Sequence, residues 1–221
     1  MKRGYDLIAG DFSRKRQGLW PELLPFAGYV KPGGRVLDVG CGNGRLRALF
    51  KDMDVRYTGV DNSNKLLRLA KENQELRIKN QEFAVTDALA LPFGDNRFDA
   101  VFSVAVLHHI PSDKLRLKFL REAGRVLRDD GALVVTVWNL RRLKFLKYRV
   151  RALLNKKLGP GDILYPWKNE EGETVLERYF HCFAKGELVR LFKKAGFRIE
   201  EAGFTKKRRN IYAVGRPSLN G

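Results

Sequence analysis

The chain has 221 residues, which is enough for one domain with a sizeable core. Lysine and arginine outnumber aspartate and glutamate by 43 to 25, so the net charge at neutral pH is +18. The two cysteines, Cys41 and Cys182, cannot form a disulfide framework or a four-ligand zinc site, and no apolar run reaches the ~20 residues of a membrane span. The first residues lack the apolar stretch of a secretory signal peptide. We therefore expect a cytoplasmic protein with an anionic partner, rather than a secreted or membrane-spanning one.

The positive charge is concentrated in three segments. Residues 1–18 carry a net charge of +3, residues 141–168 carry +8, and residues 205–221 carry +5. The long central block, 19–140, carries only +3 over 122 positions. A solubilising surface would scatter its charge over the whole fold, whereas this clustering favours a polyanion such as nucleic acid.

Short apolar runs alternate with helix-like stretches from residue 35 onward. This pattern predicts strands at 35–39, 55–60, 82–85, 98–104 and 132–138. Capping residues and helical periodicity predict helices at 45–50, from 61–63 to about 80, and from 111 to about 127. Strands that alternate with helices indicate a parallel sheet covered on both faces.

After Trp138 the regular pattern stops for about forty residues. A helix is predicted again at 185–195, and the apolar runs at 197–204 and 210–215 predict a hairpin with a basic turn. A long irregular segment is unusual in a compact domain unless it has a function. We therefore interpret residues 139–181, which include the most basic segment, as a lid or platform on the substrate side.

A glycine-rich turn follows the first predicted strand. Residues 38–44 read Asp-Val-Gly-Cys-Gly-Asn-Gly, and glycines let the backbone approach a ligand closely at the start of a helix. The Gly-x-Gly-x-Gly spacing after an acid differs from the Gly-x-Gly-x-x-Gly of a dinucleotide site. Taken alone, the turn is weak evidence, because a dehydrogenase or a plain tight turn would also explain it.

Two more acids stand at the ends of the next two predicted strands. Asp61 lies 23 residues after Asp38, where a carboxylate can accept two hydrogen bonds from ribose hydroxyls. Asp87 follows the third strand, where it can meet an exocyclic amine. The three acids share one sheet edge, where open α/β folds bind ligands. Either acid alone could equally be a helix cap or a turn former.

Residues 38–44, Asp61, Asp87 with residues 91–93, and residues 98–101 together resemble the motif set of class I S-adenosylmethionine-dependent methyltransferases. The resemblance implies an α/β, Rossmann-like fold with a mostly parallel seven-stranded sheet, helices on both faces and a C-terminal antiparallel hairpin. It implies S-adenosyl-L-methionine as cofactor, with the glycine loop at the methionine moiety, Asp61 at the ribose and Asp87 with Ala88 at the adenine. The expected cofactor-binding residues are Asp38, Gly40, Cys41, Gly42, Asn43, Gly44, Asp61, Asn62, Asp87, Ala88 and Ser103.

A narrower resemblance covers the rest of the chain. It rests on residues 5–21 (Tyr-x-x-Ile-Ala-x-x-Phe, an arginine and Trp-Pro), 105–109, 137–138, 162–168 and 178–188. These segments are similar to the tRNA wobble-uridine carboxymethyl methyltransferases and to the methyltransferase domain of their AlkB-type homologue. Members of that family esterify 5-carboxymethyluridine to its methyl ester, and they commonly work with a small zinc-ribbon activator. The resemblance thus implies tRNA, through its anticodon loop, and such an activator as partners. The tail at 206–212 departs from the family's aromatic-rich ending.

Methyl transfer from a sulfonium to a carboxylate needs no general base, because the acid is already ionised at neutral pH. Catalysis then depends on alignment and on removal of water, and an arginine fork can orient the acid. We expect Arg16, His109 and Arg178 to be the catalytic residues, and we expect no metal. The expected substrate-binding residues are His108, Trp138, Trp167, Tyr179, His181, Lys156 and Lys157. Of these, Trp167 and Tyr179 would stack on bases, Lys156 and Lys157 would follow phosphates, and the two histidines would lie near the modified base. Arg16 could instead be a surface residue, and His181 a core histidine.

Two other hypotheses remain open. The first keeps the cofactor but assigns a small-molecule or lipid-quinone acceptor, which the basic insertion disfavours. The second is a non-catalytic RNA-binding module, which the intact glycine loop and Asp61 disfavour. We divide a single methyltransferase domain, 1–221, into an N-terminal substrate-side segment (1–34), a cofactor-binding core (35–138), a basic substrate-side insertion (139–181) and a C-terminal helix and hairpin (182–221).

Overall fold

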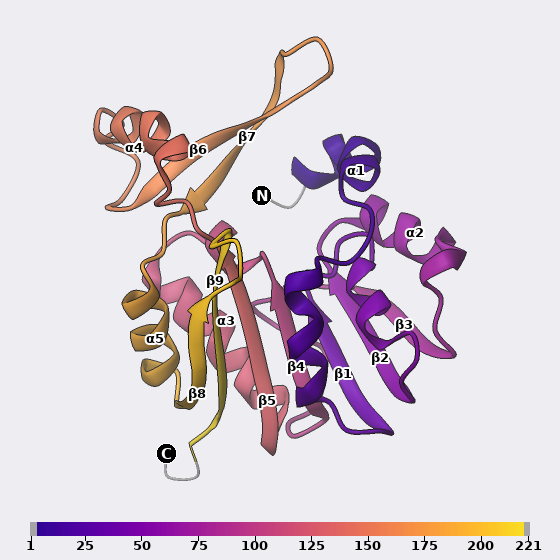
Figure 1. Cartoon of the computed structure of the whole chain (residues 1–221). Helices are drawn as coiled ribbons and strands as arrows, with labels where there is room; N and C mark the ends of the chain where they lie inside the picture. Colours follow the sequence, from indigo (N-terminus) through magenta and orange to yellow (C-terminus); the bar gives the residue numbers. More distant parts are fainter. Residues whose placement is uncertain (1–3, 219–221) are drawn as a thin grey trace.

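A seven-stranded sheet forms the centre of the computed structural model, which describes residues 4–218. The strands follow the order β3-β2-β1-β4-β5-β9-β8 (Figure 1). Their bounds are β1 Gly34–Val39, β2 Val55–Asp61, β3 Asn80–Val85, β4 Phe98–Val104, β5 Leu127–Trp138, β8 Phe197–Phe204 and β9 Asn210–Pro217. Strands β1 to β5 pair in parallel, whereas β9 runs antiparallel to both β5 and β8. The predicted fold class is confirmed, including the C-terminal antiparallel hairpin.

Helices cover both faces of this sheet. On one face, α3 (Asp113–Val126) and α5 (Lys185–Lys194) bury Phe119, Leu120 and Phe192 against β4, β5 and β9. On the other face, the 3-10 helices η1 (Pro21–Tyr29) and η2 (Arg45–Phe50) bury Phe26 and Phe50. Each such side chain contributes roughly 1.5–3 kcal/mol by leaving water. The two layers therefore hold the ends of β1 to β5 in place, where the functional residues lie.

The end of one helix and the start of one strand differ from the predicted ones. The helix expected to reach residue 80 is α2 (Asn64–Glu72), followed by the short 3-10 helix η3 (Gln74–Leu76). Asn73 causes the break, because its side chain accepts a hydrogen bond from the Leu76 amide at 3.3 Å, and such side-chain bonds compete with helix continuation. Strand β5 begins at Leu127, five residues early, because Leu127 pairs with Phe98 of β4.

The prediction that residues 139–181 are irregular is wrong. They form η5 (Leu143–Phe145), α4 (Leu146–Leu153) and a two-stranded antiparallel sheet of β6 (Asp162–Lys168) and β7 (Thr174–His181). We call residues 139–181 the arm; Figure 1 shows it rising above one end of the main sheet. The arm has a small core of its own, in which Phe145, Ile163 and Phe180 are buried. The sequence pattern did not predict this core, because the apolar residues of α4 do not form a buried face. Leu146, Val150 and Leu153 are exposed.

The N-terminal helix α1 (Gly4–Lys15), which the pattern did not predict, packs against α2 and against β7 of the arm. Only Ile8 and Ala9 of α1 are buried, which explains why its sequence shows no clear apolar stripe. Between β4 and α3 lies one further short 3-10 helix, η4 (Leu107–His109). Within residues 4–218, no helix combines the length and the apolar character needed to cross a membrane.

Candidate functional site

The loop between β1 and η2 adopts a backbone that glycine favours. Gly40, Gly42 and Gly44 have φ angles of 77°, 56° and 73°. A Cβ atom on Gly40 would lie 2.4 Å from Cγ2 of Val106, a distance that neither side can accommodate. The three glycines are therefore required by the shape of the loop, and their backbone can approach a ligand without side chains in between.

Two aspartates, Asp38 and Asp61, support this loop. The Asp38 carboxylate is 2% exposed and accepts a 2.7 Å hydrogen bond from the Tyr57 hydroxyl, and burial raises its pKa to about 7. The Asp61 carboxylate accepts hydrogen bonds of 2.9 Å from the backbone amides of Gly42 and Ser63. Burial raises the Asp61 pKa, and these amide bonds partly oppose that rise. Asp61 is thus in direct contact with the glycine loop, whereas Asp38 supports it from the interior.

The other predicted cofactor-binding residues surround the same loop. Ser103, at the end of β4, is fully buried and its hydroxyl has no hydrogen-bond partner among the described residues. Cys41 is buried, and burial raises the pKa of its thiol well above the usual value. Asp87 is exposed, and its side chain accepts a hydrogen bond from the Leu89 amide at 3.0 Å, which is the geometry of a turn former. Asn62 and Ala88 follow the acids at the ends of β2 and β3.

Helix α1 covers the glycine loop. The Asn43 amide donates to the Ser13 hydroxyl at 3.2 Å and to the Arg16 carbonyl at 3.1 Å. Asp6 accepts a 2.5 Å hydrogen bond from the Ser63 hydroxyl, which ties α1 to the start of α2. The Trp167 indole of β6 donates to the Asp11 carboxylate at 2.7 Å. Helix α1 therefore lies between the loop and the arm and is bonded to both.

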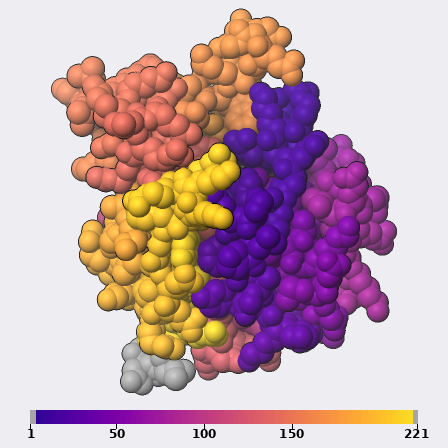
Figure 2. Space-filling model, in the orientation of Figure 1, coloured from indigo at the N-terminus to yellow at the C-terminus, as the bar shows by residue number. Residues whose placement is uncertain are grey.

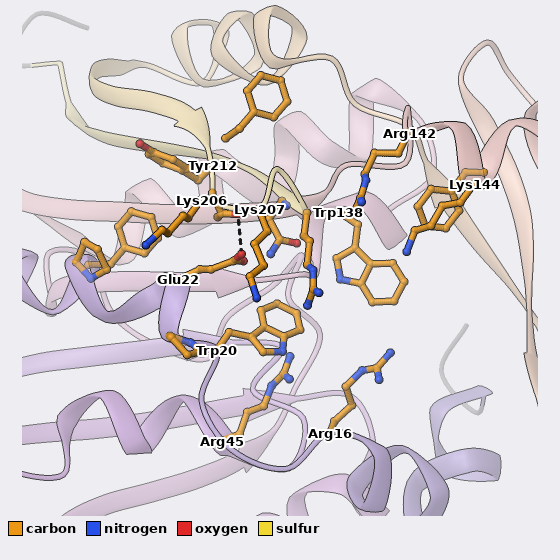
Figure 3. Close-up of a pocket in the computed structure, with 18 of the residues that line it drawn as sticks. Arg16, Trp20, Glu22, Arg45, Trp138, Arg142, Lys144, Lys206, Lys207 and Tyr212 are labelled. Carbon is orange, nitrogen blue, oxygen red and sulfur yellow. Dashed lines mark hydrogen bonds between the residues drawn. The ribbon is translucent and has the colours of Figure 1, made fainter.

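Beside this covered loop the structure has a cavity of about 910 Å³ that is lined by basic and aromatic side chains (Figure 3). Its basic lining residues are Lys15, Arg16, Arg45, Arg142, Lys144, Arg178, Lys206, Lys207 and Arg209. Its aromatic lining residues are Trp20, Phe26, Trp138, Phe145, Tyr165, Phe204 and Tyr212. Among residues 4–218 the only acids in the lining are Glu22 and Glu201, so the cavity is suited to an anionic ligand with flat rings.

Two predicted catalytic arginines lie in this cavity without an acidic partner. Among the described residues neither Arg16 nor Arg178 forms a salt bridge, and the Arg178 Nε is buried with no hydrogen-bond partner. Both guanidiniums make cation–π contacts with tryptophan rings. Arg178 lies 4.8 Å from the ring centre of Trp167, and Arg16 lies 5.8 Å from that of Trp138. Burial and the charge of Arg178 lower the pKa of Arg16. Two like charges held this close favour a bound anion.

The two neighbouring histidines are neutral. Burial, followed by the charge of Arg178, lowers the pKa of His109 to about 3, and burial lowers that of His108 well below its usual value. The His109 Nδ1 lies 3.2 Å from the Tyr179 carbonyl, so this nitrogen carries the proton, and Nε2 accepts from the Tyr5 hydroxyl at 3.0 Å. His108 stacks on Phe180 with ring centres 5.2 Å apart. Both rings therefore shape the site without adding charge to it.

Several predicted substrate residues lie outside the cavity. His181 bridges the Asp162 carboxylate at 2.7 Å and the Glu187 carboxylate at 2.6 Å, and it is buried where the arm joins α5. The Tyr179 hydroxyl donates to Asp162 in the same network at 2.6 Å. Lys156 and Lys157 are exposed beyond the end of α4, and Trp167 contacts Arg16 and Arg178 from behind. Of the predicted catalytic and substrate residues, Arg16, Trp138 and Arg178 line the cavity itself.

The sequence interpretation missed several residues that line the cavity. Arg45 is the first residue after the glycine loop, and its guanidinium lies 4.0 Å from the ring centre of Trp20. Lys206 and Lys207, in the turn between β8 and β9, face it across the cavity (Figure 3), and Arg209 of the same turn also lines the cavity. Their concentrated charge was visible in the sequence, but nothing in the pattern indicated that this turn folds back to the glycine loop. Among residues 4–218, no group of three or more His, Cys, Asp and Glu side chains is placed to hold a metal ion.

Comparison with known proteins gives consistent matches. Residues 37–135 match a family described as "Methyltransferase domain". A Schizosaccharomyces pombe tRNA (carboxymethyluridine(34)-5-O)-methyltransferase is 31% identical over 91% of this chain and 90% of its own length. The Xenopus tropicalis enzyme of the same name, alkbh8, is 30% identical over 83% of this chain, which spans only 35% of that longer protein.

Solved structures agree with this fold. A SAM-dependent methyltransferase from Methanosarcina mazei has a TM-score of 0.75 and 26% identity, covering 92% of this chain and all of the other. The putative methyltransferase in a complex with the Haloferax volcanii Trm112 methyltransferase activator has a TM-score of 0.68 and 17% identity, covering 97% of both chains, and shows the shared fold. Because the fission-yeast relative matches over nearly its whole length, the chain belongs to the family of the tRNA (carboxymethyluridine(34)-5-O)-methyltransferases.

Proposed function

We propose that this protein methylates the carboxylate of 5-carboxymethyluridine at the wobble position of tRNA and so forms 5-methoxycarbonylmethyluridine. The observation that carries the proposal is a pair of guanidiniums, those of half-buried Arg16 and buried Arg178, that form no salt bridge with residues 4–218 and line an aromatic cavity beside the glycine loop. A nucleobase that carries a carboxylate offers a negative charge to the guanidiniums and a flat ring to the aromatic side chains of this cavity. The protein is an S-adenosyl-L-methionine-dependent methyltransferase.

The residues around the glycine loop suit S-adenosyl-L-methionine. The positive-φ glycines leave the backbone bare, the Asp61 carboxylate can accept both ribose hydroxyls, and the Ser103 hydroxyl is buried without a partner. When bound, the cofactor supplies a methyl group on a positively charged sulfur. The Gly42 amide now bonded to Asp61 is one that the ribose would compete with. Helix α1 would then enclose the cofactor, because it is bonded to Asn43 of the loop.

The chain's own residues would act on the acceptor by holding it. The forks of Arg16 and Arg178 can bind the two carboxylate oxygens and point one toward the methyl group. The neutral His109, fixed by Tyr5 and the Tyr179 carbonyl, limits water access without neutralising the acid. Since the carboxylate is ionised at neutral pH, no proton has to move before attack. Alignment and exclusion of water are worth up to about 7–11 kcal/mol in favourable cases, so they suffice as the main source of rate.

The surroundings of the cavity support an RNA acceptor over a small molecule. Figure 2 shows the N-terminal residues, the arm and the β8–β9 hairpin meeting on one face of the molecule, and each of the three contributes basic side chains to the cavity. Such a surface can grip phosphates on several sides of one extruded nucleotide. A small-molecule or lipid-quinone acceptor would leave most of these charges without a partner. The exposed Lys156 and Lys157 would extend the grip along the anticodon stem.

The decisive experiment incubates the purified protein with S-adenosyl-L-methionine and two tRNA preparations, of which only one carries wobble 5-carboxymethyluridine. Nucleoside mass spectrometry should find 5-methoxycarbonylmethyluridine in that preparation alone. Arg16→Gln and Arg178→Gln should lower this yield at least tenfold while calorimetry finds cofactor binding intact. Equal methylation of both preparations, or full activity of both variants, would refute the proposal.

A small zinc-ribbon activator is the proposed protein partner. The support is the family membership and the shared fold with the methyltransferase seen in complex with an activator. Co-expression with such a protein should raise methyl-ester formation, and an unchanged rate would contradict this part of the proposal. We also retain the division of one domain into segments 1–34, 35–138, 139–181 and 182–221 as a proposal, with the arm and the N-terminal segment on the acceptor side.

A further inference from the structure

Arg45 is a half-buried cation to which the site described above gives no role. Its guanidinium lies 4.0 Å from the ring centre of Trp20, and its Nη1 is buried with no hydrogen-bond partner among residues 4–218. Among the described residues it forms no salt bridge. Burying a guanidinium nitrogen without a partner costs free energy, so a bound group is expected to accept a hydrogen bond from Nη1.

The surroundings of Arg45 add to this surplus of positive charge. Burial, and then the charge of Arg16, lower the pKa of Arg45 to about 10. The charge of Asp38 opposes this lowering, but its carboxylate already accepts a hydrogen bond from the Tyr57 hydroxyl and is almost fully buried. Figure 3 shows the Arg45 and Arg16 side chains rising into the same cavity, with Trp20 beside Arg45. Arg16, Arg45 and Arg178 thus share one lining, and none of the three forms a salt bridge within residues 4–218.

One acceptor carboxylate offsets only one of these three charges. A nucleotide within an RNA strand brings phosphodiesters on both sides of its sugar, and each adds one negative charge within reach of the same cavity. An arginine whose face is fixed on an indole presents its donors edge-on, which suits the paired oxygens of a phosphate or carboxylate. The residue therefore has the geometry of an oxyanion clamp.

We propose that Arg45, held by Trp20, forms an anion-binding subsite for the acceptor strand, taking either a phosphate next to the methylated nucleotide or its carboxylate. The identity of the acceptor rests on the proposed function, but the subsite itself does not. The subsite lies next to the glycine loop because Arg45 immediately follows Gly44. This position allows Arg45 to hold the acceptor strand close to the cofactor-binding loop.

The test compares Arg45→Gln with the unaltered protein on two synthetic anticodon stem–loop RNAs, one carrying 5-carboxymethyluridine and one carrying uridine at the wobble position. Fluorescence anisotropy measures RNA binding, and calorimetry measures S-adenosyl-L-methionine binding. Loss of one charge-assisted contact should raise the Kd for the carboxymethyl RNA about tenfold and leave that for the cofactor within twofold. If Arg45 binds a phosphate, affinity for the uridine RNA should fall by the same factor, and the slope of log K against log salt should flatten by about 0.7. If it is the carboxylate, only the carboxymethyl RNA weakens.

The matched control is Arg121→Gln, which removes the same charge from an exposed position on α3 and should change neither Kd. Arg45→Lys keeps the charge but loses the forked donor geometry, so its Kd for RNA should lie between those of the unaltered protein and Arg45→Gln. This variant replaces Arg45→Gln in the test if the glutamine variant does not fold. Unchanged RNA binding in both Arg45 variants, or a loss confined to the cofactor, would overturn the subsite. If the unaltered protein binds both RNAs through Arg45 yet forms no methyl ester, the proposed function fails and the subsite stands.

Discussion

The buried carboxyl of Asp38 should make the fold less stable as the pH rises. In the folded protein burial raises its pKa from 3.8 to about 7, with only the Tyr57 hydroxyl as a hydrogen-bond donor. Between these two values the folded state keeps a proton that the unfolded chain releases. The unfolding free energy therefore falls by about 1.4 kcal/mol for each pH unit from roughly 4 to 7 and is constant above that range.

This window sets the size of the effect. At pH 5 ionised Asp38 in the unfolded chain already lowers stability by about 1.5 kcal/mol, and at pH 8 the cost reaches about 4 kcal/mol. Asp38→Asn keeps an oxygen for the Tyr57 hydroxyl but cannot ionise. Relative to the unaltered protein, the variant should thus gain about 2 to 3 kcal/mol more at pH 8 than at pH 5.

Urea unfolding of the cofactor-free protein at pH 5 and pH 8 measures this difference directly. The comparison is between the two proteins at each pH, so other groups that titrate in this range, such as His108 and His109, cancel. Asp52→Asn, at an exposed position after η2, is the control and should show no pH-dependent difference. If Asp38→Asn changes stability by the same amount at both pH values, Asp38 is ionised in the folded protein and the reasoning from burial is refuted.

Three further predictions address the loop, the basic turn and the arm. Gly40→Ala should abolish cofactor binding in calorimetry, because its Cβ would lie 2.4 Å from a neighbouring side chain, whereas Gly94→Ala, with open space around it, should bind normally. Lys206→Glu with Lys207→Glu should flatten the salt dependence of tRNA affinity, and an unchanged slope would remove this turn from the RNA surface. His181→Ala should lower the unfolding free energy by about 2 kcal/mol, because two carboxylates lose their shared partner. A loss below about 0.5 kcal/mol in urea unfolding would show that the bridge is not needed to attach the arm.

The sequence was a good guide wherever local chemistry decides the structure. The parallel strands could be predicted because they are short, apolar and separated by helices, and the glycine loop could be placed because its spacing follows directly from β1. Asp61 could be assigned to the loop for the same reason, since strand ends of a parallel sheet share one edge. These features depend on contacts close in sequence or on a repeated pattern.

The arm and the far wall of the cavity could not be predicted in this way. The core of the arm joins Phe145 to Phe180, 35 residues apart, and its helix exposes its leucines. His181 was expected at the substrate, but two carboxylates, Asp162 and Glu187, occupy both of its ring nitrogens. Such pairings depend on how distant segments pack, and a single sequence carries no periodic signal for them.

The charge distribution acquires a physical meaning once the three basic segments are placed in space. Residues 1–18, 141–168 and 205–221 are far apart in the chain, yet each contributes cations to one cavity. Bringing like charges together lowers the stability of the folded state, and the buried nitrogens Arg45 Nη1 and Arg178 Nε, which lack partners among residues 4–218, lower it further. The neutral sheet and its apolar layers must supply the free energy that holds them there. An anionic strand that binds in the cavity offsets this repulsion. The same clustering of positive charge that lowers the stability of the free protein therefore raises its affinity for RNA.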